Sequence, residues 1–203
     1  MELITFGTFC AMLNTTVDLA IDRRRKYRDI SYIKKGMAPR NDHHLMFSAM
    51  SISPLLDIKT IFEIGTCAGN CCRMLALLFP DAQITTIDIN EKSSDAEHAN
   101  ELLNNYSNVQ RLYIDSQCLH NDNTDNYDCI FVDGCHKFPV VASDIDWAYK
   151  HSNNIIVFDD VSSVEPDVVK ALEDLDKTIP DTIYLVETSS GLANLGLIIK
   201  RAL

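Results

Sequence analysis

The feature that most constrains the fold of this chain is a regular alternation of short β-forming runs with helical segments, which begins at residue 59. The β runs lie at residues 60–64, 83–88, 109–114, 128–132, 154–158, 182–187 and 193–200. The helical segments between them lie at residues 71–79, 94–105, 140–150 and 166–176. Strands that alternate with helices build βαβ units, which give a mostly parallel sheet with helices on both faces. The sequence therefore predicts an α/β fold with a doubly wound, Rossmann-like sheet.

The last two β runs are joined by residues 188–191 alone. A crossover between parallel strands needs about a dozen residues or more, so this loop is too short for one. The seventh strand is therefore expected to run antiparallel to its neighbour.

The N-terminal part of the chain lacks this alternation. One helical face there carries Phe9, Leu13, Val17, Ala20 and Ile21. A second helix is expected over residues 42–56. A length of 203 residues indicates one domain with a small appendage. We therefore divide the chain into a helical segment, 1–57, and an α/β domain, 58–203.

The charge and the cysteines limit the partners and the compartment. The net charge of −11 argues against nucleic acid or an anionic membrane surface as a partner. No apolar run reaches the roughly 18 residues that a membrane-spanning helix needs. The seven cysteines form no CxxC pair and no zinc-type spacing, which indicates reduced thiols in an intracellular protein. Glu2 stands where a signal peptide carries basic residues, so we expect a cytoplasmic protein.

Acidic residues end five of the predicted strands. They are Glu63, Asp88, Asp115, Asp133, Asp159 and Asp160. In open α/β sheets, ligands bind at the carboxyl ends of the strands. Carboxylates gathered along that edge repel one another unless a partner neutralises them, so a cationic or hydroxyl-rich ligand is expected there.

The loop after the first strand contains Gly65 and Gly69 in a Gly-x-x-x-Gly pattern, directly before a helix. Glycine lets a ligand approach the backbone, and the helix N-terminus offers free N–H groups. The pattern is neither Gly-x-Gly-x-x-Gly nor a P-loop, which disfavours a dinucleotide or a phosphate. Asp88 follows the loop by 19 residues, where an acidic residue can bind the two hydroxyls of a ribose. The plainer alternative is that the glycines only turn the chain and that Asp88 caps a helix.

Residues 62–88 resemble the glycine loop and the ribose-binding acid of class I S-adenosylmethionine-dependent methyltransferases, and the resemblance extends over about residues 58–200. It implies a seven-stranded sheet of order 3-2-1-4-5-7-6 with strand 7 antiparallel. It also implies S-adenosylmethionine as the cofactor, with the loop around the methionine part, Asp88 at the ribose, and Asp115 and Ser116 at the adenine. The cofactor-binding residues that it implies are Glu63, Gly65, Thr66, Gly69, Asp88, Asp115 and Ser116.

Asp133 ends the fourth strand, and Asp159 and Asp160 end the fifth. Neighbouring strand ends lie about 4.8 Å apart, so three carboxylates can converge on one cation, and oxygen ligands favour Mg²⁺ or Mn²⁺ over zinc. Spacing alone leaves N-capping of the following helices as an equal alternative. The pattern resembles metal-dependent O-methyltransferases of the catechol type and of the type that acts on macrolide and aminocoumarin deoxysugars. That resemblance implies Asp133, Asp159 and Asp160 as the metal ligands.

His136 stands three residues after the first of these ligands, where the catechol type has a lysine. The resemblance implies His136 and Asp133 as the catalytic residues, although the neighbouring Lys137 leaves the identity of the base open. The other histidines, His43 among them, have no comparable context. A divalent ion would stabilise the alkoxide of a sugar hydroxyl, and His136 would accept its proton.

We therefore expect a metal-dependent O-methyltransferase that acts on a sugar hydroxyl, such as that of a rhamnose in a glycan. The Asp-Gly-x-His pattern and an aromatic content of 8% favour a sugar over a catechol or another phenol. A non-catalytic S-adenosylmethionine-binding partner in a glycan-assembly complex and a nicotinamide dehydrogenase remain as alternatives. Residues 1–57 are expected to form a lid or the contact of a homodimer, and to select the substrate.

Overall fold

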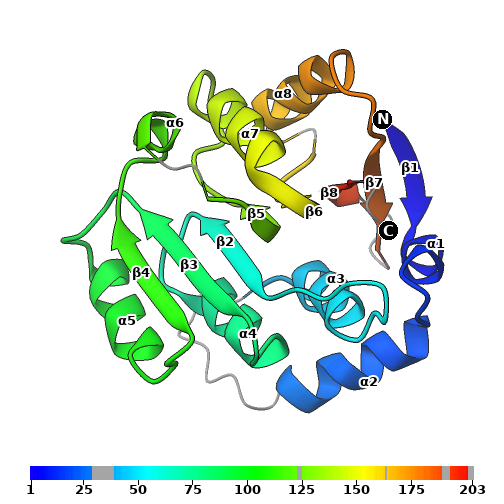
Figure 1. Cartoon of the computed structure of the whole chain (residues 1–203), viewed down its shortest axis with the longest axis horizontal. Helices are drawn as coiled ribbons and strands as arrows, with labels where there is room; N and C mark the ends of the chain where they lie inside the picture. The colour runs from blue at the N-terminus through cyan, green and yellow to red at the C-terminus, as the bar shows by residue number, and fades with distance from the viewer. Residues whose placement is uncertain (29–38, 123–124, 163, 189–192, 201–203) are drawn as a thin grey trace.

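A computed structural model describes residues 1–28, 39–122, 125–162, 164–188 and 193–200 of the chain. Its centre is an eight-stranded sheet in the order β1-β7-β8-β6-β5-β2-β3-β4 (Figure 1). The strands are β1 (Glu2–Thr5), β2 (Thr60–Ile64), β3 (Gln83–Asp88), β4 (Val109–Tyr113), β5 (Tyr127–Val132), β6 (Ser152–Phe158), β7 (Ile183–Glu187) and β8 (Ala193–Ile199). The helices are α1 (Phe6–Met12), α2 (Val17–Arg28), α3 (Asn41–Ser51), α4 (Asn70–Leu78), α5 (Ser94–Leu103), α6 (Leu119–Asp122), α7 (Val140–His151) and α8 (Pro166–Asp176).

The order and direction of strands β2 to β8 confirm the sequence prediction. β2 lies between β5 and β3, and both pairs are parallel. β8 runs antiparallel to β6 and to β7, as the short loop before it requires. Central strands of a parallel sheet are covered on both faces, and in β2 all of residues 61–64 are buried. A continuous buried run therefore ends at the edge where the site is expected.

β1 is a strand that the sequence analysis did not predict, so the expected seven-stranded sheet is one strand short. It pairs in parallel with β7, in a register that joins Glu2 to Tyr184 and Thr5 to Glu187. It is four residues long and lies at the edge of the sheet, where Leu3 is exposed. A short edge strand buries little apolar surface, so its residues carry no clear alternation.

The helical face predicted around residues 9–21 is divided between α1 and α2. Asn14, between them, has a φ of 51°, in the left-handed region that asparagine tolerates better than most residues. Thr16 then caps α2, because its Oγ1 accepts the N–H of Leu19. The prediction of one continuous face was therefore wrong, because the apolar spacing runs across a helix end that these two polar residues create.

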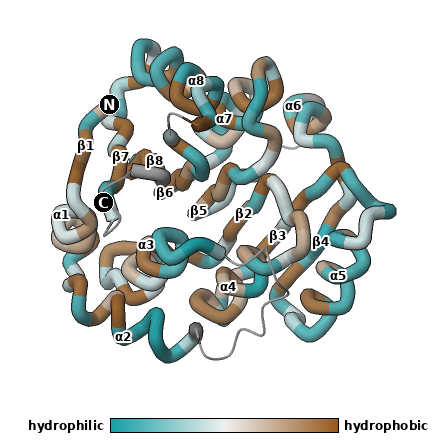
Figure 2. The backbone as a smooth tube through the Cα atoms, turned by 180° about the vertical axis from the view of Figure 1, so that it is seen from behind, coloured by the Kyte–Doolittle hydropathy of each residue, from teal (hydrophilic) through white to brown (hydrophobic). Residues whose placement is uncertain are grey.

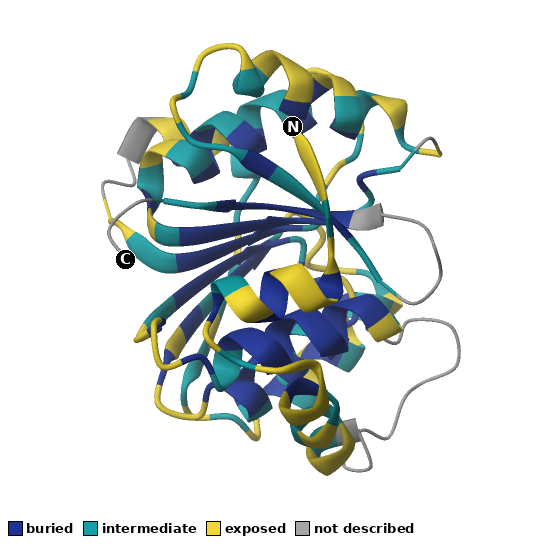
Figure 3. Cartoon of the chain, turned by 90° about the vertical axis from the view of Figure 1, so that its right-hand side faces the viewer, coloured by how far each residue is buried: buried dark blue, intermediate teal, exposed yellow. Residues whose placement is uncertain are grey.

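Helices cover both faces of the sheet, as Figure 3 shows from the side. One core joins Phe9 of α1 and Phe47 of α3 to Leu75 of α4 and to the strands. A second core, on the other face, contains Trp147 of α7 and Leu172 of α8. Figure 2 shows the chain from behind, with hydrophobic stretches in the central strands. The N-terminal helices thus share a core with the sheet, which places the start of α3 close to the strand ends.

Within the residues that the structure describes, no helix has the length and hydrophobicity to cross a membrane.

Candidate active site

The loop between β2 and α4 is built around two glycines with positive φ. Gly65 has a φ of 103°, and a Cβ at this position would lie 2.0 Å from the backbone oxygen of Asp133. Gly69 has a φ of 80° and precedes the first turn of α4. The backbone N–H groups of Gly65 and Thr66 both donate to the carbonyl oxygen of Ile87 at the end of β3. The loop therefore lies between the ends of β3 and β5, and only glycine fits at residue 65.

Glu63 lies beneath this loop, inside the protein. Its carboxylate accepts the hydroxyl of Thr86, and the hydroxyls of Thr86 and Thr66 lie 2.6 Å apart. Burial raises the pKa of Glu63 to about 8. Glu63 and Thr66 are both buried, so these two predicted cofactor residues support the loop from below.

A pocket of about 460 Å³ opens at the carboxyl ends of β2, β3, β4 and β5. This volume is typical of sites for small molecules. The predicted residues that line it are Gly65, Asp88, Asp115, Ser116 and Asp133. The structure therefore brings together four of the seven predicted cofactor residues at one cavity, together with a predicted metal ligand.

The carboxylate of Asp88 is held by two backbone N–H groups. Its Oδ2 accepts from Cys67 at 2.7 Å, and its Oδ1 accepts from Asn90 at 2.9 Å. Asp88 thus fixes the glycine loop and also lines the pocket, so the structural and the functional interpretations both apply to it. The sequence analysis missed Ile89, which lines the same pocket and is 71% exposed. The sequence feature that could have identified Ile89 is an apolar residue directly after the acidic residue that ends a strand.

His136 lies between the carboxylates that end β5 and β6. Its Nε2 is 3.7 Å from Oδ1 of Asp133, and its Nδ1 is 3.4 Å from Oδ2 of Asp160. The contact with Asp133 raises the pKa of His136, against the effect of burial. Burial raises the pKa of Asp133 to about 6, against the effect of its contact with His136. The structure therefore places an imidazole between two carboxylates, beside the pocket that Asp133 lines.

Lys137, the alternative base, has a partner elsewhere. Its Nζ lies 2.5 Å from Oε2 of Glu165, the residue before α8, and its side chain is 63% exposed. The geometry therefore favours His136 over Lys137 as the group that accepts a proton.

A cation from the N-terminal segment faces the two aspartates that end β6. The guanidinium of Arg40 donates to Asp159 and to Asp160 through separate nitrogens. Its Nε donates to Asp42 at 3.3 Å. Asp159 is 4% exposed, whereas the side chain of Arg40 is 37% exposed. Sequence reasoning missed Arg40, because 119 residues separate it from Asp159 and no motif connects them.

His43 also reaches Asp159 from α3. Its Nδ1 accepts the backbone N–H of Arg40 at 3.2 Å, so its Nε2 carries the proton and donates to Oδ1 of Asp159 at 2.9 Å. Burial alone would raise the pKa of Asp159. The hydrogen bond from His43 and the charge of Arg40 outweigh burial and lower that pKa to about 2. His43 is therefore part of the site, although its sequence context gave no sign of it.

The three predicted metal ligands lie on neighbouring strand ends, but Arg40 already contacts two of them. Among the described residues, no three His, Cys, Asp or Glu side chains are placed to hold a metal ion. The carboxylates of Asp133, Asp159 and Asp160 have the oxygen chemistry that Mg²⁺ and Mn²⁺ require. The donor chemistry thus fits a divalent ion, while the cation that the carboxylates hold in this arrangement is a guanidinium.

A larger pocket, of about 810 Å³, opens beside the start of α3. Its lining includes Thr5, Phe6, Arg24, Asn41, Leu45 and Glu187. Asn41 directly follows Arg40 in the chain, and Glu187 ends β7, which runs in the same direction as β6. The larger pocket therefore lies at the same edge of the sheet as the strand-end carboxylates.

Comparison with known proteins gives one family match and several solved structures with the same fold. A family model described as a methyltransferase domain matches residues 62–161, a range that runs from β2 to just past Asp160. None of the curated proteins matches the chain. The chain shares its fold with an O-methyltransferase from Bacillus cereus in complex with SAH (S-adenosylhomocysteine), with a TM-score of 0.62 and 18% identity over 96% of each chain.

A second solved structure with this fold is the SAH-bound methyltransferase PaMTH1 from Podospora anserina. Its TM-score is 0.65 and its identity 16%, over 89% of this chain and 87% of that chain. The shared fold confirms the predicted α/β fold, and the match to a methyltransferase domain supports the predicted enzyme class.

Proposed function

We propose that the protein transfers a methyl group from S-adenosylmethionine to a hydroxyl oxygen. The observation that carries this proposal is the position of His136 between Asp133 and Asp160, beside the pocket that Asp133 lines. A hydroxyl must lose its proton as it attacks a methyl group, and an imidazole is suited to accept that proton near neutral pH.

The 460 Å³ pocket is the proposed donor site. Asp88 would accept hydrogen bonds from the ribose hydroxyls, and Asp115 and Ser116 would lie toward the adenine. The exposed apolar side chain of Ile89 offers a surface for the flat base. Asp133 brings negative charge to the same pocket, which favours a sulfonium ligand.

The methyl group of a sulfonium is already activated, so the protein mainly has to align the acceptor oxygen with it. The acceptor oxygen forms a bond to the methyl carbon as the carbon–sulfur bond breaks, and the sulfonium becomes a neutral thioether. The hydroxyl proton moves to His136, and Asp133 and Asp160 stabilise the resulting imidazolium.

A sugar is the proposed acceptor, with a deoxyhexose such as rhamnose as the first candidate. The 810 Å³ pocket supports this choice, because Thr5, Arg24, Asn41 and Glu187 offer hydrogen-bonding groups to a ligand rich in hydroxyls. Phe6 is the aromatic residue in that lining. A catechol or another phenol is the second candidate, and it would depend more on aromatic and apolar walls.

A divalent ion fits the donor chemistry of the strand ends, where Asp133, Asp159 and Asp160 would hold it. When bound, Mg²⁺ or Mn²⁺ would act as a Lewis acid that stabilises the alkoxide of the acceptor.

The test is methyl transfer from a labelled donor to a panel of methyl rhamnosides, other methyl glycosides and catechols. We expect label in the rhamnosides, with a loss of about 100-fold or more for His136→Ala. His120→Ala is the matched control, since His120 bonds Ser143 on the surface. Turnover of catechols alone would overturn the sugar acceptor. Donor binding without transfer to any acceptor would favour a non-catalytic partner of a glycan-assembly complex.

A further inference from the structure

We propose that Arg40 is an exchangeable internal cation, which holds the carboxylates at the end of β6 and must leave them before a divalent ion can bind. This inference rests on the metal dependence in the proposed function. The juxtaposition that carries it is the guanidinium of Arg40 across Asp159 and Asp160, which are two of the three proposed metal ligands.

Arg40 and the ion would use the same atoms. Separate guanidinium nitrogens contact Oδ1 of Asp159 and Oδ1 of Asp160. Oδ1 of Asp159 also accepts from His43, so this oxygen already has two donors. An ion at these oxygens would meet the positive charge of the guanidinium at close range, where like charges repel strongly. Binding of Arg40 and binding of the ion are therefore mutually exclusive.

The carboxylates need a cation when no ion is present. Asp159 is buried, and a buried carboxylate without a partner destabilises the folded state strongly. Arg40 removes this penalty, because its guanidinium donates one charge-assisted hydrogen bond to each of the two carboxylates. The guanidinium therefore preserves the ion-free site in a folded, ordered form.

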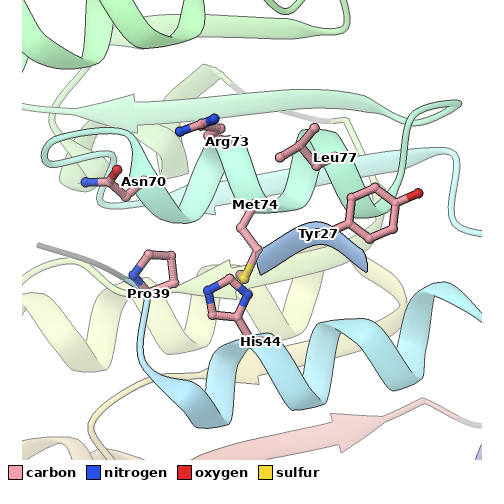
Figure 4. Close-up of a pocket in the computed structure, with 7 residues that line it drawn as sticks. All are labelled: Tyr27, Pro39, His44, Asn70, Arg73, Met74 and Leu77. Carbon is pink, nitrogen blue, oxygen red and sulfur yellow. The ribbon is translucent and has the colours of Figure 1, made fainter. Parts of the chain in front are cut away.

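Arg40 can leave by a movement of its side chain alone. The chain around it is anchored: Pro39, directly before Arg40, and His44, in the first turn of α3, line a cavity of about 10 Å³ beside Met74 of α4 (Figure 4). This space has room for no more than about one water molecule, so the backbone has little freedom to shift.

The side chain of Arg40, by contrast, is 37% exposed. Its Nε already contacts Asp42, which lies outside the proposed ligand set. Asp42 can therefore keep the guanidinium when the strand-end aspartates turn to the ion.

The experiment measures Mn²⁺ binding by electron paramagnetic resonance, with no donor and no acceptor present. We expect Arg40→Met to bind Mn²⁺ about tenfold or more tightly than the native protein, because the competing cation is gone. Arg40→Lys keeps a positive charge but loses the two separate guanidinium nitrogens. Its Mn²⁺ affinity should therefore lie between that of the native protein and that of Arg40→Met. Arg25→Met is the matched control, since Arg25 is exposed and paired with Asp22, and it should bind like the native protein.

Thermal unfolding gives a second measure of the same exchange. Without Mn²⁺, Arg40→Met should melt below the native protein, and saturating Mn²⁺ should raise its melting temperature more than that of the native protein. If Arg40→Met does not fold, the affinity of Arg40→Lys decides the question.

Equal or weaker Mn²⁺ binding by the Arg40 variants overturns the inference, and so does an absence of binding in every variant. Neither result bears on methyl transfer, because the assay with the labelled donor uses no Arg40 variant. Conversely, Arg40→Met could bind Mn²⁺ more tightly while no acceptor in the panel receives the labelled methyl group. That result would support the exchange of Arg40 for the ion and contradict the proposed acceptor.

Discussion

The Nε2 atom of His43 lies 2.9 Å from Oδ1 of Asp159, although 116 residues separate the two in the chain. This contact, with that of Arg40, holds the pKa of Asp159 near 2, below its ordinary value of 3.8. The N-terminal segment therefore stabilises the ionised form of a buried carboxylate in the site.

His43→Leu should destabilise the protein by about 1 to 3 kcal/mol at pH 7, because it leaves a buried carboxylate with one donor fewer. An acid with a lowered pKa contributes stability above its unfolded pKa and loses it as the pH falls through the folded pKa. The difference from the native protein should therefore be constant above about pH 5 and shrink toward pH 2. Urea unfolding between pH 2 and pH 7 measures this difference in the free energy of unfolding, with His120→Leu as the control. A difference that does not change with pH would contradict the role of His43 in lowering the pKa of Asp159.

Glu63→Gln should stabilise the protein, and more so at higher pH. Burial raises the pKa of Glu63 from 4.5 to about 8, so the folded state keeps a proton that the unfolded state has lost. The native protein therefore loses stability as the pH rises from about 4.5 to 8, and glutamine removes this loss. Urea unfolding at pH 4.5 and pH 8 should show equal stabilities at the lower pH and a more stable variant at the higher. The exposed Glu101→Gln serves as control, and a variant less stable at pH 8 would refute the prediction.

Gly65→Ala should abolish donor binding. Its Cβ would lie 2.0 Å from the backbone oxygen of Asp133, and the backbone has a φ of 103° that alanine rarely adopts. Calorimetric titration with S-adenosylhomocysteine measures the effect. Gly7→Ala is the control, because its Cβ would meet only ordinary contacts, the nearest at 3.7 Å. Unchanged affinity in Gly65→Ala would mean that the loop does not form the donor site.

Val17→Trp should raise the KM for the acceptor by about tenfold while leaving the KM for the donor unchanged. Val17 lines the 810 Å³ pocket, so a larger side chain there reduces the space that we assign to the acceptor. Leu19→Trp is the matched control, because Leu19 lies on the same helix, is 56% exposed and is absent from that lining. If Val17→Trp and Leu19→Trp have the same KM for the acceptor, the acceptor does not bind in the 810 Å³ pocket.

Most of the sheet could be predicted from the sequence, because most of its strands are encoded by local runs of β-forming residues. The bounds of β2 and β3 match the predicted runs, since each is a short β-rich segment that ends at a glycine or an acidic residue. α8 begins at Pro166 as predicted, because proline is favoured in the first turn of a helix. Features of this kind depend on neighbouring residues alone.

The parts that were missed depend on contacts between distant residues. β1 forms only because β7 offers it an edge, and its own four residues carry little signal. Arg40 and His43 gain their roles from the packing of α3 against the sheet, which no local pattern encodes. The positions of Asp133 and His136 at the candidate site could be predicted, because both residues follow the end of a strand.

The pairing of β1 with β7 also has a consequence for the order of events during synthesis. Because synthesis runs from the N-terminus to the C-terminus, Glu2 leaves the ribosome well before its partner Tyr184. Until then β1 has no template, and afterwards it covers an edge that would otherwise recruit a strand from another polypeptide. The nascent chain must therefore carry the residues of β1 unpaired until β7 has been synthesised, so that β1 joins the sheet only after a long-range contact has formed.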